Sequence, residues 1–139
     1  MDTDHTPLTE RSWLLQNKLN PFPVGGELSF DGHRLRFELG ELAGEAMLGW
    51  VAERMNITKD LLQQRLRGGE RIDAFVIESD HLEVSWPKIM GGAAMEVTDP
   101  QGRTWLIAMD YPSGGAITQT LNLISGRRKA KQWRAVLAH

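Results

Sequence analysis

Apolar and polar residues alternate with a period of two on both sides of an Asp-Gly pair in the first third of the chain. The alternation runs through residues 27–30 and resumes in residues 34–39. Asp31-Gly32 lies between the two runs, and this pair favours the positive φ values of a tight hairpin turn. The pattern therefore predicts a β-hairpin.

The period then lengthens to about 3.6 residues, which is typical of amphipathic helices. One helix is predicted over residues 41–55 and a second over residues 59–67, with Thr58 as its N-cap and Gly68-Gly69 as its end. The two would form a helical insertion at about residues 41–68. The residues expected to face inward are Leu42, Ala46, Met47, Trp50 and Val51 in the first helix and Leu61, Leu62 and Leu66 in the second.

Strand patterns return after the helical pair. Residues 72–77, 82–86, 95–98 and 105–109 are apolar or alternate. The last two stretches flank a turn, residues 99–102, with proline in the favoured second position and glycine in the fourth. These stretches predict an antiparallel meander, and a further strand at residues 117–123 is left open.

A short helix is also predicted near the N-terminus, over residues 10–19. Thr9 is a suitable N-cap, and the proline-containing segment after residue 19 would end the helix. Trp13 and Leu14 would then face inward.

The last helix predicted from the periodicity covers residues 126–138. Ala130, Trp133 and Leu137 recur at spacings of three and four and would share its apolar face. Its other face is basic, because the last 19 residues hold five of the 16 lysines and arginines and none of the 18 acidic residues. This face is either the binding site of an anionic partner or a solvated helix surface. The five cations are Arg127, Arg128, Lys129, Lys131 and Arg134.

The length of 139 residues and the hydrophobic content of 41% are ordinary for a globular protein, so residues 1–139 are expected to form a single domain. The absence of cysteine excludes disulfides and thiolate metal sites, and a reducing, cytoplasmic compartment is the simplest fit. No stretch approaches the roughly 18 apolar residues of a membrane span. The N-terminus is acidic where a signal peptide would be basic. We therefore expect neither a signal peptide nor a transmembrane segment.

No residue pattern points to catalysis, a metal ion or a cofactor. The four histidines, His5, His33, His81 and His139, are dispersed and lack the spacing of zinc sites. None of the glycine pairs has the sequence of a phosphate-binding loop, which lies between a strand and a helix and contains a lysine. We therefore expect no enzyme activity, no metal ligand and no cofactor.

Three of the five tryptophans, Trp50, Trp105 and Trp133, fall in phase with the apolar face of their own element, which favours packing in the core. Trp86 stands beside a proline and is less clearly placed. The strands around Trp86 and Trp105 lack the interleaved basic residues of an RNA-binding sheet. Specific nucleic-acid binding is therefore not expected.

Several of these segments resemble the pleckstrin-homology-like superfamily. Residues 26–28 (Gly-Glu-Leu) and 34–37 (Arg-Leu-Arg-Phe) resemble the first hairpin of GRAM and bacterial pleckstrin-homology-like domains. Residues 82–86 and 96–105 are similar to the middle strands of that superfamily. The resemblance implies an α+β fold, with an antiparallel curved sheet or barrel, a C-terminal capping helix, and binding of lipid, peptide or protein through loops and edges. It covers residues 25–39 and about 72–138.

The leading functional hypothesis is a non-catalytic binding or scaffold domain for a protein, peptide or lipid. A second is peripheral association with an anionic membrane or nucleic acid through the basic C-terminal helix. A third is a small-molecule-binding protein or small enzyme with a pocket between the helical pair and the sheet, which requires convergent polar groups there. Self-association through exposed strand edges or the helical pair stays open.

Overall fold

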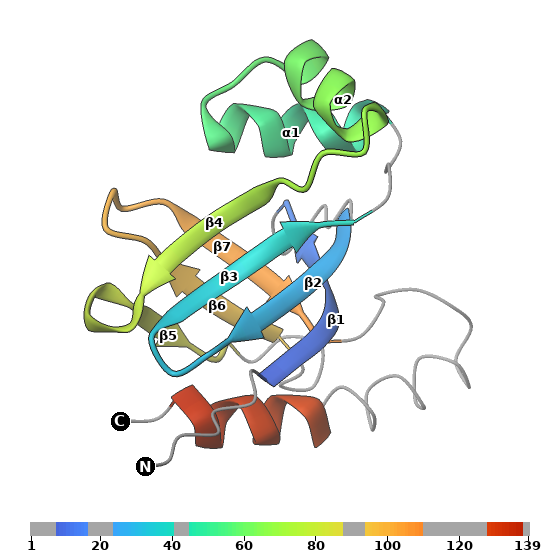
Figure 1. Cartoon of the computed structure of the whole chain (residues 1–139). Helices are drawn as coiled ribbons and strands as arrows, with labels where there is room; N and C mark the ends of the chain where they lie inside the picture. Colours follow the sequence, from blue (N-terminus) through green and yellow to red (C-terminus); the bar gives the residue numbers. More distant parts are fainter. Residues whose placement is uncertain (1–7, 17–23, 41–44, 88–93, 110–127, 138–139) are drawn as a thin grey trace.

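The computed structural model describes residues 8–16, 24–40, 45–87, 94–109 and 128–137. Within these residues it contains one antiparallel sheet of seven strands and three α-helices, which confirms the α+β class. The sheet is curved and is not closed into a barrel (Figure 1).

The strands lie in the spatial order β4-β3-β2-β1-β7-β6-β5, and each neighbouring pair is antiparallel. β1 joins the two halves of the sheet, because it pairs with β2 on one side and with β7 on the other. β4 and β5 are the edges of the sheet in the described part of the chain. The bounds are β1 Leu8–Leu15, β2 Val24–Phe30, β3 Arg34–Leu39, β4 Asp73–Glu78, β5 Glu83–Ser85, β6 Ala94–Thr98 and β7 Thr104–Ala108.

The N-terminal segment is a strand and not a helix. The predicted helix over residues 10–19 is wrong, because β1 occupies Leu8–Leu15 and Thr9, the expected N-cap, pairs with Ser29 of β2. β1 lies in the middle of the sheet. Backbone hydrogen bonds to two neighbouring strands, together with burial, outweigh the local helical pattern there.

Polar residues on the inner face of β1 interrupt the alternation of apolar and polar residues by which a strand is predicted from sequence. Glu10 and Ser12 share the face of Leu14, which belongs to the main core. Trp13 lies on the opposite face, beside Leu15 in a second, smaller apolar cluster. The expectation that Trp13 and Leu14 face the same way is therefore wrong.

The predicted hairpin is confirmed as β2 and β3. Gly32 has a φ of 97°, and Asp31 Oδ1 accepts hydrogen bonds from the backbone N–H groups of His33 and Arg34 at 2.8 Å each. These hydrogen bonds, first that of Arg34 and then that of His33, lower the pKa of Asp31. The carboxylate of Asp31 thus fixes the turn that the sequence pattern indicated.

Gly26 in β2 faces β3 too closely for any side chain. A Cβ atom there would lie 2.5 Å from the Phe37 ring and would also collide with the backbone oxygen of Glu38. Gly26→Ala is therefore expected to lower the free energy of unfolding by about 1–3 kcal/mol. Gly49→Ala in α1 is the control, because its Cβ would have 3.7 Å to the nearest atom and alanine favours the helix. Chemical denaturation would measure both, and equal stabilities would contradict the close contact of β2 with β3.

The predicted helical pair is confirmed as α1, Glu45–Met55, and α2, Lys59–Arg67. Thr58 caps α2 as expected, since its Oγ1 accepts a hydrogen bond from the backbone N–H of Leu61 at 3.2 Å. Gly68 follows α2 as its C-cap. The side chain of Leu61 is 37% exposed, so the expectation that it faces inward is wrong.

The helical pair packs onto the sheet of its own chain. Val51 and Leu62 are fully buried, in the same core cluster as Phe75 of β4 and Trp105 of β7. Trp50 belongs to this cluster as well. Figure 1 shows the pair above one end of the sheet. The side chains of Leu42, Ala46 and Met47, which were expected to face inward, lie outside the described part of the chain.

A third helix, over residues 128–137, closes the opposite end of the sheet (red in Figure 1). Ala130, Trp133 and Leu137 are buried in the main core, which confirms the predicted apolar face. The predicted meander is confirmed for β5, β6 and β7, which pair in succession. β4 does not belong to it, because β4 pairs with β3 at the opposite edge of the sheet, and the short 3-10 helix Ser79–His81 follows β4. Residues 117–123 lie outside the described residues.

Candidate functional site

An open hollow lies where α1 meets the end of β1 and the start of β7. Its volume is about 440 Å³. All but one of the described lining residues are polar or charged, and two of them contribute guanidinium groups, one from α1 and one from the turn before β7. The lining residues are Gln16, Trp50, Glu53, Arg54, Arg103 and Thr104.

Arg54 is a half-buried residue of α1 that lines the hollow. Its Nη1 donates to the carbonyl oxygen of Thr104 at 3.1 Å, and its Nη2 donates to that of Gln16 at 3.4 Å. The guanidinium carbon lies 5.2 Å from the centroid of the Trp50 ring and 5.7 Å from that of Trp105, within the range of cation–π attraction. Two backbone oxygens and two indole rings therefore hold the side chain in place.

The charge of Arg54 has no direct counterion in the described part of the chain. The ion pairs formed there by other arginines do not include it. Burial lowers the pKa of Arg54, because it removes water from the cation, and the nearby charge of Glu53 opposes this effect. Arginine nonetheless stays protonated at neutral pH. The hollow therefore presents one partly desolvated positive charge.

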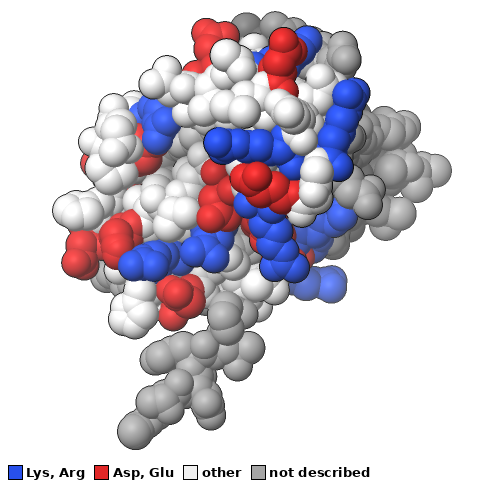
Figure 2. Space-filling view, turned by 45° about the horizontal axis from the view of Figure 1, so that its top comes forward, with Lys and Arg blue, Asp and Glu red and all other residues white. Residues whose placement is uncertain are grey.

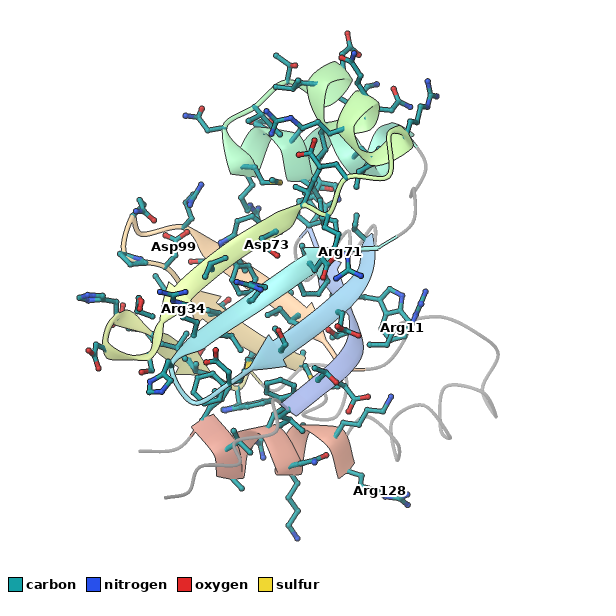
Figure 3. All side chains as sticks on the ribbon, in the orientation of Figure 1. Arg11, Arg34, Arg71, Asp73, Asp99 and Arg128 are labelled. Atoms are coloured by element: carbon teal, nitrogen blue, oxygen red, sulfur yellow. The ribbon has the colours of Figure 1, made fainter. Side chains whose placement is uncertain are left out.

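Arg103, the second arginine, is held by a buried carboxylate. The Asp99 side chain is 2% exposed, and its Oδ2 lies 2.7 Å from Nε of Arg103. Asp99 Oδ1 accepts the backbone N–H groups of Gln101 and Arg103 at 3.0 and 2.9 Å, while the indole Nε1 of Trp105 donates to Oδ2 at 3.3 Å. Figure 3 shows Asp99 at the turn between β6 and β7.

This network ties the turn between β6 and β7 to α1, because Nη1 of Arg103 donates to the carbonyl oxygen of Arg54 at 3.1 Å. Burial alone would raise the pKa of Asp99. The hydrogen bonds from the Arg103 backbone, the Trp105 indole and the Arg103 guanidinium outweigh it and lower the pKa. Asp99 is therefore ionised at neutral pH and offsets the charge of Arg103.

Sequence reasoning identified the turn at residues 99–102 but missed this site. Arg54 was not singled out, and its hydrogen-bond acceptors are 50 and 38 residues away in the chain. The one local signal is that Arg54 follows Trp50 by four residues and so lies beside it on the helix.

The basic C-terminal helix is partly engaged by the rest of the domain. Lys129 lies 3.7 Å from the carboxylate of Glu10 in β1, and its Nζ donates to the backbone oxygen of Met109 at 3.4 Å. Lys129 therefore contributes to docking the helix onto the sheet. Arg127 lies outside the described residues.

The other three cations of this helix differ among themselves. The guanidinium of Arg134 lies over the ring of Trp86, 4.8 Å from its centroid, which gives Trp86 a partner near the sheet edge. Arg128 and Lys131 are exposed, and Arg128 points away from the sheet (Figure 3). The structure thus separates the predicted basic face into engaged and solvated residues.

Opposite charges alternate over the outer face of β3 and β4. Three ion pairs span 3.3 to 3.6 Å, and their exposed members contribute little stability. Figure 2 shows both signs interspersed on the face that it presents. Such a mixed surface does not favour a polyanionic partner. The pairs are Arg34 with Glu78, Arg36 with Asp73, and Arg71 with Glu38.

The histidines do not converge within the described residues. His33 is exposed in the hairpin between β2 and β3, and His81 is exposed in the 3-10 helix, while His5 and His139 lie outside the described part. Among the residues that the structure describes, no group of three or more histidine or acidic side chains is placed to hold a metal ion. In the same part of the chain, no helix has both the length and the apolar character needed to cross a membrane.

No family model, curated protein or solved structure matches this chain. Function is therefore inferred from the chemistry of the described residues. Among the surfaces that they form, the hollow at Arg54 combines a partly buried charge, the ring of Trp50 and an opening to solvent, and the fully buried ring of Trp105 lies 5.7 Å from the guanidinium carbon.

Proposed function

We propose that the chain is a non-catalytic binding domain and that its ligand occupies the hollow between α1 and the sheet. The observation that carries this proposal is Arg54, whose half-buried guanidinium has no acidic partner among the described residues. A charge that is partly removed from water without a counterion costs free energy. A ligand that supplies acceptor oxygens would recover part of this cost.

The polar groups in the hollow also meet the requirement of a ligand-binding pocket between the helical pair and the sheet. Arg54 and Glu53 come from α1, whereas Gln16 follows β1 and Thr104 begins β7. Pockets that bind small molecules combine a few convergent polar groups with aromatic side chains. The described lining residues include no histidine, cysteine, serine or lysine, which favours binding over catalysis.

We propose a pleckstrin-homology-like scaffold for this domain. Three features support it: the strand order β4-β3-β2-β1-β7-β6-β5, the antiparallel pairing throughout, and a C-terminal helix with Trp133 on its inner face. They agree with the order of hairpin, meander and helix on which the resemblance rests. In such a domain a rigid sheet supports binding residues on its loops and edges.

The test is a two-dimensional ¹H–¹⁵N NMR screen of the full chain with neutral, anionic and cationic fragments. We expect anionic or polar fragments to shift the backbone signals of residues 53–54 and 103–104 and the indole signals of Trp50 and Trp105. Arg128→Ala, which alters an exposed cation of the C-terminal helix, is the control and should bind as the unaltered chain does. The proposal fails if no fragment shifts the signals of the hollow more than those elsewhere.

Membrane association through the basic helix gives a separate prediction. Arg128 and Lys131 are the exposed cations of this helix for which no contact within the described part of the chain is seen, whereas the exposed Arg134 lies over Trp86. Each basic residue near an anionic surface contributes about 1 kcal/mol. We therefore expect weak sedimentation with phosphatidylserine vesicles at low salt and none at physiological salt. Strong sedimentation at physiological salt, lost in an Arg128→Ala, Lys131→Ala double variant, would favour the membrane over the hollow.

A further inference from the structure

The charges around the hollow limit the charge of its ligand. Asp99 offsets the charge of Arg103 through the 2.7 Å ion pair, so Arg54 is the cation left to attract a ligand among the described lining residues. Glu53 is exposed and belongs to the same lining, where its negative charge acts on Arg54. A ligand with a second negative charge would find no further unpaired cation for it among the described lining residues, and Glu53 would repel it. The charge balance therefore favours a monoanion.

The donors of Arg54 limit the shape of the ligand. A guanidinium carries five N–H groups, and the two hydrogen bonds to Thr104 and Gln16 use one on each terminal nitrogen. Within the described part of the chain, Nε and the second hydrogen of each terminal nitrogen make no hydrogen bond and are left for a ligand. These donors lie in one plane, and two donors from one guanidinium match the two oxygens of a carboxylate.

The surroundings of Arg54 hold these planar N–H donors in a fixed orientation before a ligand binds. The two backbone oxygens set the direction of the guanidinium plane, and the rings of Trp50 and Trp105 restrict its movement. The hydrogen bond from Arg103 to the carbonyl oxygen of Arg54 holds the helix end in position. A donor group that is already oriented loses less entropy when it binds.

From this arrangement, and resting on the proposed function, we infer that the ligand carries a single carboxylate and that the guanidinium of Arg54 receives both of its oxygens. Gln16 and Thr104, which also line the hollow, supply polar groups for the part of the ligand next to the carboxylate. The ligand class is therefore a monocarboxylate with a neutral polar group close to the acid.

Three small probes test this assignment by NMR titration of the full chain at pH 7.5 and constant ionic strength. They are N-acetylglycine, its neutral amide N-acetylglycinamide, and inorganic phosphate. We expect N-acetylglycine to shift the Nε–H signal of Arg54 and the indole signal of Trp105 with saturation in the millimolar range. We expect the neutral amide to cause no saturable shift.

Glu53→Gln is the matched variant, because Glu53 is exposed and its replacement should leave the fold intact. Removing its negative charge should tighten the binding of N-acetylglycine by about 3- to 10-fold. Arg54→Lys should abolish saturation, since a lysine cannot present the planar fork. A well-dispersed spectrum of each variant establishes that it is folded.

Each other outcome overturns the assignment in a distinct way. If phosphate binds the hollow more tightly than N-acetylglycine, the ligand is a phosphate and not a carboxylate, while the proposed binding function stands. If N-acetylglycinamide binds as tightly as N-acetylglycine, the negative charge of the ligand does not contribute to binding, and the assignment of a carboxylate to Arg54 is wrong. If none of the three probes saturates, the inference is wrong, and the fragment screen then decides separately whether the hollow binds another class of ligand.

Discussion

Trp133→Ala is expected to lower the free energy of unfolding by about 3–5 kcal/mol, the usual cost of truncating a large buried aromatic side chain. Trp133 is fully buried and lies in the main core with Leu137 of the same helix. Its loss would leave a cavity between the C-terminal helix and the sheet. A thermal melt should show a decrease in Tm of roughly 10 °C or more for a chain of this length.

Trp133→Phe distinguishes the contribution of apolar packing to stability from that of the indole N–H group. The indole Nε1 of Trp133 is buried and has no hydrogen-bond partner in the described structure, which is itself unfavourable. Phenylalanine removes this donor and keeps most of the apolar contact, so we expect a loss of only about 1 kcal/mol. Gln132→Ala, an exposed change one residue away, is the control. An unchanged Tm in Trp133→Ala would show that the helix does not close the sheet.

Asp99→Ala is expected to cost about 2–4 kcal/mol, because it leaves several buried donors without an acceptor. The backbone N–H groups of Gln101 and Arg103, the Arg103 guanidinium and the Trp105 indole all converge on this carboxylate. Asp80→Asn is the control, since Asp80 is exposed in the 3-10 helix. Equal chemical denaturation midpoints for the two variants would contradict a structural role for Asp99.

The effect of Asp99 should also depend on pH in a defined direction. Its pKa is lower in the folded chain than in the unfolded chain, so the unfolded chain binds the proton more readily. The stabilisation is therefore present above the ordinary aspartate pKa of about 3.9 and is lost as the pH falls through the folded value. The stability difference between the unaltered chain and Asp99→Asn should be largest near neutral pH and shrink below about pH 4.

Much of the fold could be predicted because its signals are local. The Asp31-Gly32 turn, the Thr58 cap and the turn at residues 99–102 each depend on residues within four positions of one another. The inner face of the last helix was also visible, since Trp133 and Leu137 are four residues apart. In each case the side chain that forms the structure lies beside the backbone that it fixes.

The N-terminal strand could not be predicted because its signal is distant. β1 is stabilised by β2 and by β7, which begins at Thr104, and the polar Glu10 and Ser12 interrupt its alternation. Among the described residues, the charged partner of Glu10 is Lys129, which lies more than 100 residues later in the chain. A local pattern contains none of this information.

The candidate site was hidden for the same reason. The charge asymmetry of the sequence drew attention to the C-terminal helix, where contacts with Glu10 and Trp86 occupy two of the cations. Arg54 had no such signal, because the groups that make it a candidate binding residue come from separate segments. The helical pair, unexpected in the resemblance, supplies this arginine.

The central claim is that the junction of α1 and the sheet presents Arg54 to an anionic ligand. Crystals of the full chain soaked in sodium bromide, measured at the bromine absorption edge, would test it most directly, because bromide is a monoanion with a strong anomalous signal. We predict an anomalous peak in the hollow in contact with the guanidinium of Arg54, and its loss in crystals of Arg54→Lys. Peaks at Arg128 and Lys131, with an empty and solvent-accessible hollow, would contradict the claim.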